Sequence, residues 1–312
     1  ARRGPKNFYT LYRAHDYHFR IYGALFLGQS AIALETAGWL ESAIPEDLLR
    51  VTSPSMSDWL EGFVGMRVHV LIRFGRWEDL LALPLPADQE LYCVTTAMLH
   101  YGKGIAAAAS GDVPRAEREQ QLFARAFAAV PISRMLFNNT CRDILAVAEA
   151  MLAGELAYRR GDIEVAFAAL RTAIDLDDHL PYDEPWGWMQ PTRHAYGALL
   201  LEQGRVADAA KVYEADLGID GSIPRALQHP GNVWSLHGYH ECLVRSGRDG
   251  EARIIGQQLA LARAMADVPI TASCFCRLSV GGSTVSDPCG GHSRALCGGH
   301  EHDGCACGDA HH

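Results

Sequence analysis

Six glycines divide the chain into a repeated pattern of helix, turn and helix. Gly28, Gly75, Gly111, Gly161, Gly204 and Gly247 follow one another at spacings of 47, 36, 50, 43 and 43 residues. Helical periodicity flanks each of them, as in CRDILAVAEAMLAGELAYRR before Gly161 and GDIEVAFAALRTAI from that glycine onward. A glycine just past a helix end supplies the left-handed residue that ends the helix. The pattern therefore predicts about six helix-turn-helix hairpins.

The prolines support an all-α fold because they fall between the predicted hairpins, where a helix must stop. They are Pro45, Pro54, Pro84, Pro86, Pro131, Pro181, Pro185 and Pro224. Alternation typical of strands is nowhere sustained, which gives an α/β or all-β fold little support. We expect a right-handed helical-repeat solenoid over residues 1–278, followed by a separate tail over residues 279–312.

Several stretches resemble known repeat proteins. ALLLEQGRVADAAKVYEADL is similar to the end of the first helix and most of the second helix of a tetratricopeptide (TPR) unit. FYTLYRAHDYHFRIYGALFLGQS, MRVHVLIRFGRWEDLL, PYDEPWGWMQPTRHAYGALLLEQG and QHPGNVWSLHGYHECL resemble a family of TPR-domain proteins of fungi and bacteria. The resemblance covers residues 4–278. It implies a TPR-like solenoid and no particular activity.

Composition excludes some partners and favours a reducing compartment. The formal charge of −9, with acidic and basic residues interspersed, argues against nucleic acid or an anionic membrane as partner. No apolar run reaches the roughly 20 residues that span a bilayer. Cys93, Cys141 and Cys242 stand singly in helical segments, where a small core residue in a reducing environment is the simplest interpretation. We therefore expect a cytoplasmic protein.

Histidines recur at a fixed place in the pattern. His18, His194 and His237 each lie ten residues before their turn glycine, and His100 lies eleven before its own. In a TPR-like hairpin this position is on the first helix and faces the concave groove, and His15 and His69 lie on comparable faces. These imidazoles could converge on one groove. The alternative is that each ring is a structural repeat position, hydrogen-bonded to a neighbouring helix.

The spacing of these histidines is compatible with metal binding but does not establish it. His15 and His18 are three residues apart, as are His237 and His240, so either helix could present two ligands to one ion. The HExxH motif of zinc proteases is absent from the sequence.

Other residues of the predicted groove suit an anionic peptide or a small molecule. Trp188 and Trp234 would form aromatic walls, and Arg193 would supply a fixed cation. The alternative is that the tryptophans fill gaps between hairpins. Asp183 and Glu184 could act as paired carboxylates, but their proline-rich surroundings favour a solvated cap for the next helix.

The tail has the clearest chemical signal. Cys289-Gly-Gly-His292 recurs as Cys297-Gly-Gly-His300, and each unit could present a thiolate and an imidazole to one ion. The remaining candidate ligands are His302, Cys305 and Cys307. Mixed thiolate and imidazole ligands suit Zn(II) or Cu(I). The alternative is a disordered, redox-sensitive extension.

Taken together, these patterns predict a TPR-like scaffold that binds a peptide or small ligand in its concave groove and soft metal ions in its tail. One alternative is a metal-dependent enzyme that uses groove histidines as ligands, with Glu241 or Tyr101 near the reacting group. A second alternative is a purely structural protein–protein adaptor. The sequence leaves open whether the protein is an enzyme.

Overall fold

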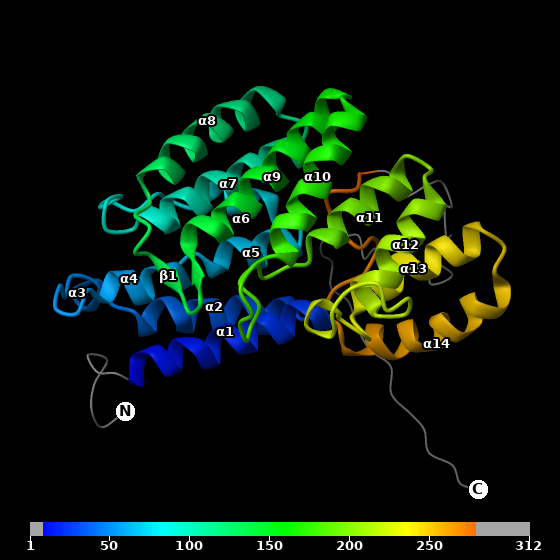
Figure 1. The fold of residues 1–312 in the computed structure, drawn as a ribbon, viewed down its shortest axis with the longest axis horizontal. Helices are drawn as coiled ribbons and strands as arrows, with labels where there is room; N and C mark the ends of the chain where they lie inside the picture. The colour runs from blue at the N-terminus through cyan, green and yellow to red at the C-terminus, as the bar shows by residue number, and fades with distance from the viewer. Residues whose placement is uncertain (1–8, 279–312) are drawn as a thin grey trace, which may run out of the picture. The chain divides into compact units, whose positions relative to one another are not determined.

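The computed structural model of the protein describes residues 9–278, and their secondary structure is almost entirely helical (Figure 1). Six hairpins pair α1 (Tyr9–Leu27) with α2 (Ser30–Ala43), α5 (Met66–Arg73) with α6 (Trp77–Ala82), α7 (Cys93–Ala109) with α8 (Val113–Ala129), α9 (Cys141–Arg160) with α10 (Ile163–Asp178), α11 (Thr192–Glu202) with α12 (Val206–Leu217), and α13 (Val233–Arg245) with α14 (Asp249–Met265). The predicted all-α class is confirmed.

Several shorter elements lie between the hairpins and were not predicted. Helices α3 (Glu46–Leu49) and α4 (Met56–Leu60) and the 3-10 helix η1 (Glu61–Phe63) follow the first hairpin. Strands β1 (Met135–Leu136) and β2 (Asn139–Thr140) form an antiparallel pair between α8 and α9, with Met135 opposite Thr140. A second 3-10 helix, η2 (Arg225–Leu227), precedes α13. They are too short for periodicity in the sequence to reveal them.

The turns between paired helices occur at the glycines predicted from the sequence. All six predicted turn glycines have positive φ, from 61° at Gly75 to 89° at Gly161. Since an L side chain rarely adopts this conformation, glycine is the residue that closes each hairpin. The correspondence arises because the turn is a local feature that needs no tertiary contact to specify it.

Helices α7 and α11 are buried on nearly every side, whereas others bury one face. In α14, for example, Ala252, Ile255 and Leu259 are buried at spacings of three and four residues, as one face of a helix requires. Tyr213 of α12 is completely buried and lies against Gly197 of α11 and Gly238 of α13, where a Cβ atom would collide with its ring. No helix within residues 9–278 is both long enough and apolar enough to cross a membrane.

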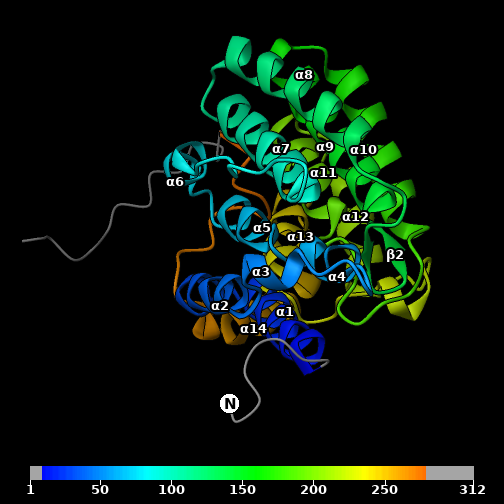
Figure 2. The ribbon, with the colours of Figure 1, turned by 90° about the vertical axis from the view of Figure 1, so that its left-hand side faces the viewer.

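The first and last hairpins are in contact. Helix α1 packs against α13 and α14, as the two views in Figures 1 and 2 show. Trp234 of α13 donates from Nε1 to the carbonyl oxygen of Leu25 at 2.7 Å, and the Asp267 carboxylate accepts from the backbone N–H of Ser30 at 2.6 Å and of Ala31 at 2.9 Å. In a solenoid each repeat contacts only its neighbours. A TPR-like solenoid is therefore not confirmed.

The C-terminal segment, residues 267–278, runs back from α14 into the interior. Ser273 donates from Oγ to the carbonyl oxygen of His194 at 2.9 Å and lies 2.5 Å from the Tyr213 hydroxyl. The Phe275 ring packs edge-on against Trp234 with centroids 5.9 Å apart. At His194 and Trp234, two of the predicted groove residues, the chain itself therefore occupies the space that a peptide was expected to fill.

Candidate functional site

A cleft of about 590 Å³ opens between three segments that are distant in the sequence. Helix α1, the loop between α10 and α11, and the segment around η2 each contribute to it. We call it the aromatic cleft; it is lined by Phe19, Tyr22, Tyr182, Asp183, Glu184, Pro185, Trp186, Arg225, Ala226, Gln228 and His229. Aromatic walls with a few polar groups are typical of sites that bind small molecules.

Two contacts hold the His229 ring in place at the aromatic cleft. Its Nδ1 lies 2.8 Å from Asp216 Oδ1, and its ring stacks on Phe26 with centroids 4.9 Å apart and 17° between the planes. Because an ionised carboxylate only accepts hydrogen bonds, Nδ1 carries the proton. In the neutral tautomer that this hydrogen bond selects, Nε2 is an acceptor, and it lies 3.4 Å from the Tyr22 hydroxyl at the wall of the cleft.

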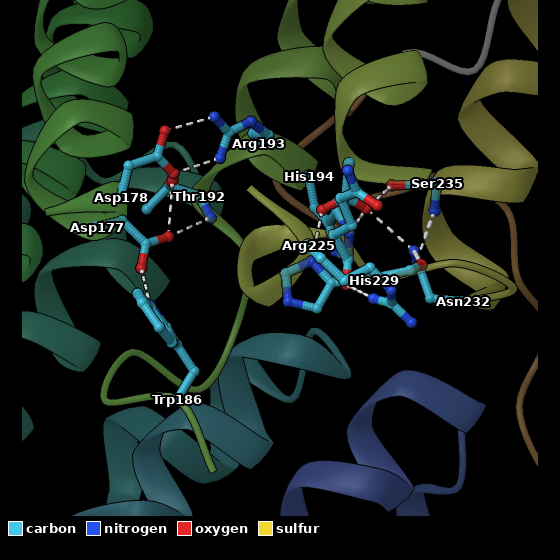
Figure 3. A network of polar contacts seen from close by, with 12 residues as sticks. Asp177, Asp178, Trp186, Thr192, Arg193, His194, Arg225, His229, Asn232 and Ser235 are labelled. Carbon is cyan, nitrogen blue, oxygen red and sulfur yellow. Dashed lines mark hydrogen bonds and ion pairs between the residues drawn. The ribbon is translucent and has the colours of Figure 1, made fainter. Parts of the chain in front are cut away.

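Asp216 of α12 is fully buried and collects hydrogen bonds from the surrounding elements. Besides His229, its carboxylate accepts from His194 Nε2 at 3.0 Å, Asn232 Nδ2 at 3.0 Å and Ser235 Oγ at 2.5 Å. Figure 3 shows these donors converging from α11, the loop before α13 and α13 itself. Burial alone would raise the pKa of Asp216, but the neighbouring His194 and His229 hold it well below its usual range.

A buried cation lies on the other side of His194. Arg73 of α5 donates from Nη1 to His194 Nδ1 at 3.2 Å and lies over the Trp234 ring, 4.4 Å from its centroid. Burial lowers the pKa of His194 to about 4 and that of Arg73 to about 9. A neutral imidazole thus separates the Arg73 cation from the Asp216 anion. Hydrogen bonds from Arg73 through His194 and Asp216 to His229 thus connect the interior to the aromatic cleft.

The loop that carries Trp186 is anchored separately. Trp186 donates from Nε1 to Asp177 Oδ1 at 3.0 Å, and Asp177 also accepts from the Thr192 hydroxyl at 3.1 Å (Figure 3). Burial raises the pKa of Asp177 to about 6. Asp183 accepts from Asn139 Nδ2 at 2.7 Å, which ties the loop to β2. Its carboxylate is therefore engaged within the protein.

The predicted groove residues are distributed over several environments. His18 and His69 are buried in the interior, where Phe63 packs edge-on against His18 and Trp188 packs edge-on against His69. Burial lowers the pKa of both imidazoles to about 3. Both ring nitrogens of His18 and Nδ1 of His69 lack a hydrogen-bond partner among the described residues.

The other predicted groove residues make separate contacts. His15 Nε2 lies 2.8 Å from the carbonyl oxygen of Glu184, His100 Nδ1 lies 2.8 Å from Glu119 of α8, and His237 Nδ1 lies 2.7 Å from Arg263 of α14. Arg193 forms a two-pronged ion pair with Asp178, with both N–O distances 2.6 Å. The structure thus brings His194 and Trp234 to the same cation, Arg73, and brings His15 and His69 near His18, but places His100 and His237 apart.

Sequence reasoning missed Tyr22, Asp216 and His229 as site residues. His229 stands in the polar link between two hairpins, and Asp216 is the one buried residue among the three acidic residues of the Ala-rich helix α12. A lone carboxylate on the buried face of a helix is the signal that could have drawn attention to Asp216, since such a group needs partners. Asn232 caps the N-terminus of α13, because its side chain accepts from the Ser235 N–H at 2.9 Å.

Within residues 9–278 no group of three or more His, Cys, Asp or Glu side chains is arranged to hold a metal ion. The proposed ligands of the tail, Cys289, His292, Cys297, His300, His302, Cys305 and Cys307, lie outside the described residues. No protein-family model, curated protein or solved structure matches the chain. The resemblance to TPR-domain proteins therefore stays a prediction.

Proposed function

We propose that this chain is a binding protein that holds a small ligand, or the end of a peptide, in the aromatic cleft. The observation that carries the proposal is the fixed orientation of His229, whose ring is held by Asp216 and Phe26 while Nε2 faces Tyr22 at the cleft wall. A site that is ordered before its ligand arrives loses less conformational entropy on binding. The helical hairpins then act as a rigid support for loops that carry the binding residues.

The lining defines the chemistry of the ligand. The rings of Phe19, Tyr22, Tyr182 and Trp186 favour a planar or apolar group. His229 Nε2 accepts a hydrogen bond, so the ligand carries an O–H or N–H donor beside that group. The Arg225 guanidinium at the same cleft favours a carboxylate or another anionic substituent. We infer a ligand that combines a flat ring, a hydrogen-bond donor and an acidic group.

A fragment screen by ligand-observed NMR tests this proposal. Aromatic hydroxy acids and short peptides that end in an aromatic residue are mixed with the wild-type protein and with His229→Ala. Loss of a buried hydrogen bond and of ring contact should weaken binding of true hits about tenfold or more. His179→Ala is the matched control, because the His179 side chain is 76% exposed and directly follows the end of α10. Hits that bind all three proteins equally would exclude the aromatic cleft as the binding site.

A further inference from the structure

A second, much smaller cavity lies between three neighbouring hairpins. Its volume is about 20 Å³, which is enough for a single atom or water molecule. Met66 and His69 of α5, Met98 of α7 and Cys141 at the start of α9 line it. We call it the Met–His–Cys cavity. It is separate from the aromatic cleft, with which it shares no lining residue.

Four side chains around the Met–His–Cys cavity are soft metal donors, and the rest of its lining is aliphatic or glycine. Two thioethers, one thiol and one imidazole line it, and all four residues are at most 5% exposed. Thiolate and thioether sulfurs favour soft ions such as Cu(I) and zinc, and imidazole nitrogen binds both metals. Cys141 is a free cysteine, and His69 Nδ1 has no hydrogen-bond partner within the part of the chain that the structure describes.

Ordinary core packing accounts for only part of this arrangement. Methionine fills irregular gaps, and buried cysteine behaves as a small apolar residue. Neither fact explains the orphaned His69 nitrogen, because desolvation without a partner costs about 1–3 kcal/mol. A water molecule would need two to four polar partners, and thiols and thioethers are weak ones. An ion that binds nitrogen and sulfur would give the His69 nitrogen the partner that it lacks among the described residues.

The backbone leaves room for such an ion. Two glycines, Gly62 and Gly65, line the same cavity just before and at the start of α5. A Cβ atom at Gly62 would lie 3.0 Å from Cys141 Sγ, and one at Gly65 would lie 3.3 Å from Met98 Cγ. Glycine at these positions therefore keeps side chains away from two of the sulfur-bearing residues.

We propose that the Met–His–Cys cavity is a Cu(I) site with Cys141, His69, Met66 and Met98 as ligands. On binding, the ion replaces the proton of the Cys141 thiol, which leaves to solvent, and the oxidation state of the metal does not change. One thiolate and one monovalent cation form a neutral pair. A divalent ion such as Zn(II) would leave a net positive charge in an apolar interior, where an uncompensated charge is strongly unfavourable.

Copper titration of the full chain tests the site. The metal-free protein is titrated anaerobically with Cu(I) in competition with a chromophoric Cu(I) chelator. The site variant is Met98→Leu/Cys141→Ala, and the control variant is Met151→Leu/Cys242→Ala, which alters a methionine and a buried free cysteine elsewhere. All three proteins keep the same tail. Wild type and control should bind one more Cu(I) per chain than the site variant.

Thermal unfolding gives a second measurement that isolates the folded core. Binding to the native state raises the midpoint of unfolding by mass action. Cu(I) should therefore raise the midpoint more in wild type and control than in the site variant. A folded site variant with the same copper stoichiometry and the same rise would overturn the proposal, as would an equal, site-dependent rise with Zn(II).

A conservative substitution covers the case in which the double variant does not fold. Met66→Leu nearly preserves side-chain volume, so the core should tolerate it. It removes one thioether ligand, and we expect its affinity for Cu(I) at this site to fall at least tenfold. Unchanged affinity in this variant would overturn the proposed four-ligand site, because copper would then bind without the Met66 thioether.

Discussion

At the scale of single residues, Asp216 accepts hydrogen bonds from four side chains while fully buried. Its negative charge also balances the buried Arg73 cation, because the imidazole between them is neutral. Asp216→Asn keeps the shape of the side chain but removes the charge. Breaking one partner of a buried ion pair leaves the other uncompensated, so we expect a loss of about 3–5 kcal/mol in the free energy of unfolding, measured with urea.

Asp208→Asn is the matched control for this prediction. Asp208 lies on the same helix, pairs with Arg205 at 3.0 Å, and has a side chain that is 47% exposed. An exposed ion pair contributes at most about 1 kcal/mol, so the midpoint of unfolding should hardly move. Equal effects of the two substitutions on the free energy of unfolding would show that the buried charge of Asp216 does not stabilise the fold.

Residues also show how far the sequence could predict the site. The place of His194 near the start of its helix follows from the turn glycine and is local. Its hydrogen bonding cannot be predicted from the local sequence, because Arg73 and Asp216, which fix its tautomer, lie 121 and 22 residues away. The aromatic cleft likewise joins α1 to loops near residues 184 and 229. Contacts of this kind depend on tertiary packing, which periodicity does not encode.

At the scale of elements, the C-terminal segment closes over the second hairpin turn. Gly75 has φ of 61°, and a Cβ atom there would lie 2.9 Å from the Cβ atom of Phe275. Gly75→Ala therefore adds a steric clash to backbone strain, and we expect it to lower the free energy of unfolding by about 2–4 kcal/mol. Urea denaturation monitored by circular dichroism measures the effect.

Gly204→Ala separates strain from packing. Gly204 has φ of 74°, and nothing among residues 9–278 lies within 4 Å of a Cβ atom built there. Only the strain of a left-handed alanine remains, which costs about 1–2 kcal/mol. If Gly75→Ala and Gly204→Ala destabilise the protein equally, the segment is not packed on the turn as described.

At the scale of the whole molecule, the hairpins could be predicted from the sequence, but the contact between the first and last hairpins could not. Each hairpin depends on an amphipathic pair of helices and a turn glycine, all within about 50 residues of sequence. Contact between the ends depends on bonds such as Trp234 to Leu25, which join residues 209 positions apart. The C-terminal segment then covers helices that an open array would expose. This is why His194, which was predicted to line a groove, is an interior residue.

Interior histidines make the whole fold sensitive to acid. The pKa of His18 is lowered to about 3 by burial and by the nearby His69 and His15, against 6.5 in the unfolded chain. The folded state therefore takes up its proton only near pH 3, whereas the unfolded state does so near pH 6.5. Stability is present above pH 6.5 and is lost as the pH falls toward 3. At pH 5 one such histidine lowers the free energy of unfolding by about 2 kcal/mol relative to neutral pH.

His18→Leu tests this linkage in the simplest setting, because both ring nitrogens of His18 lack a hydrogen-bond partner within the described range. Leucine removes the titrating group and leaves an apolar side chain among apolar neighbours. We expect the loss of stability between pH 7 and pH 5, measured by urea denaturation, to be about 2 kcal/mol smaller in the variant than in wild type. His179→Leu should not make that loss smaller, because Asp175 raises the pKa of this exposed histidine where burial lowers that of His18. An equal pH dependence in His18→Leu and wild type would mean that His18 is hydrated in the folded protein.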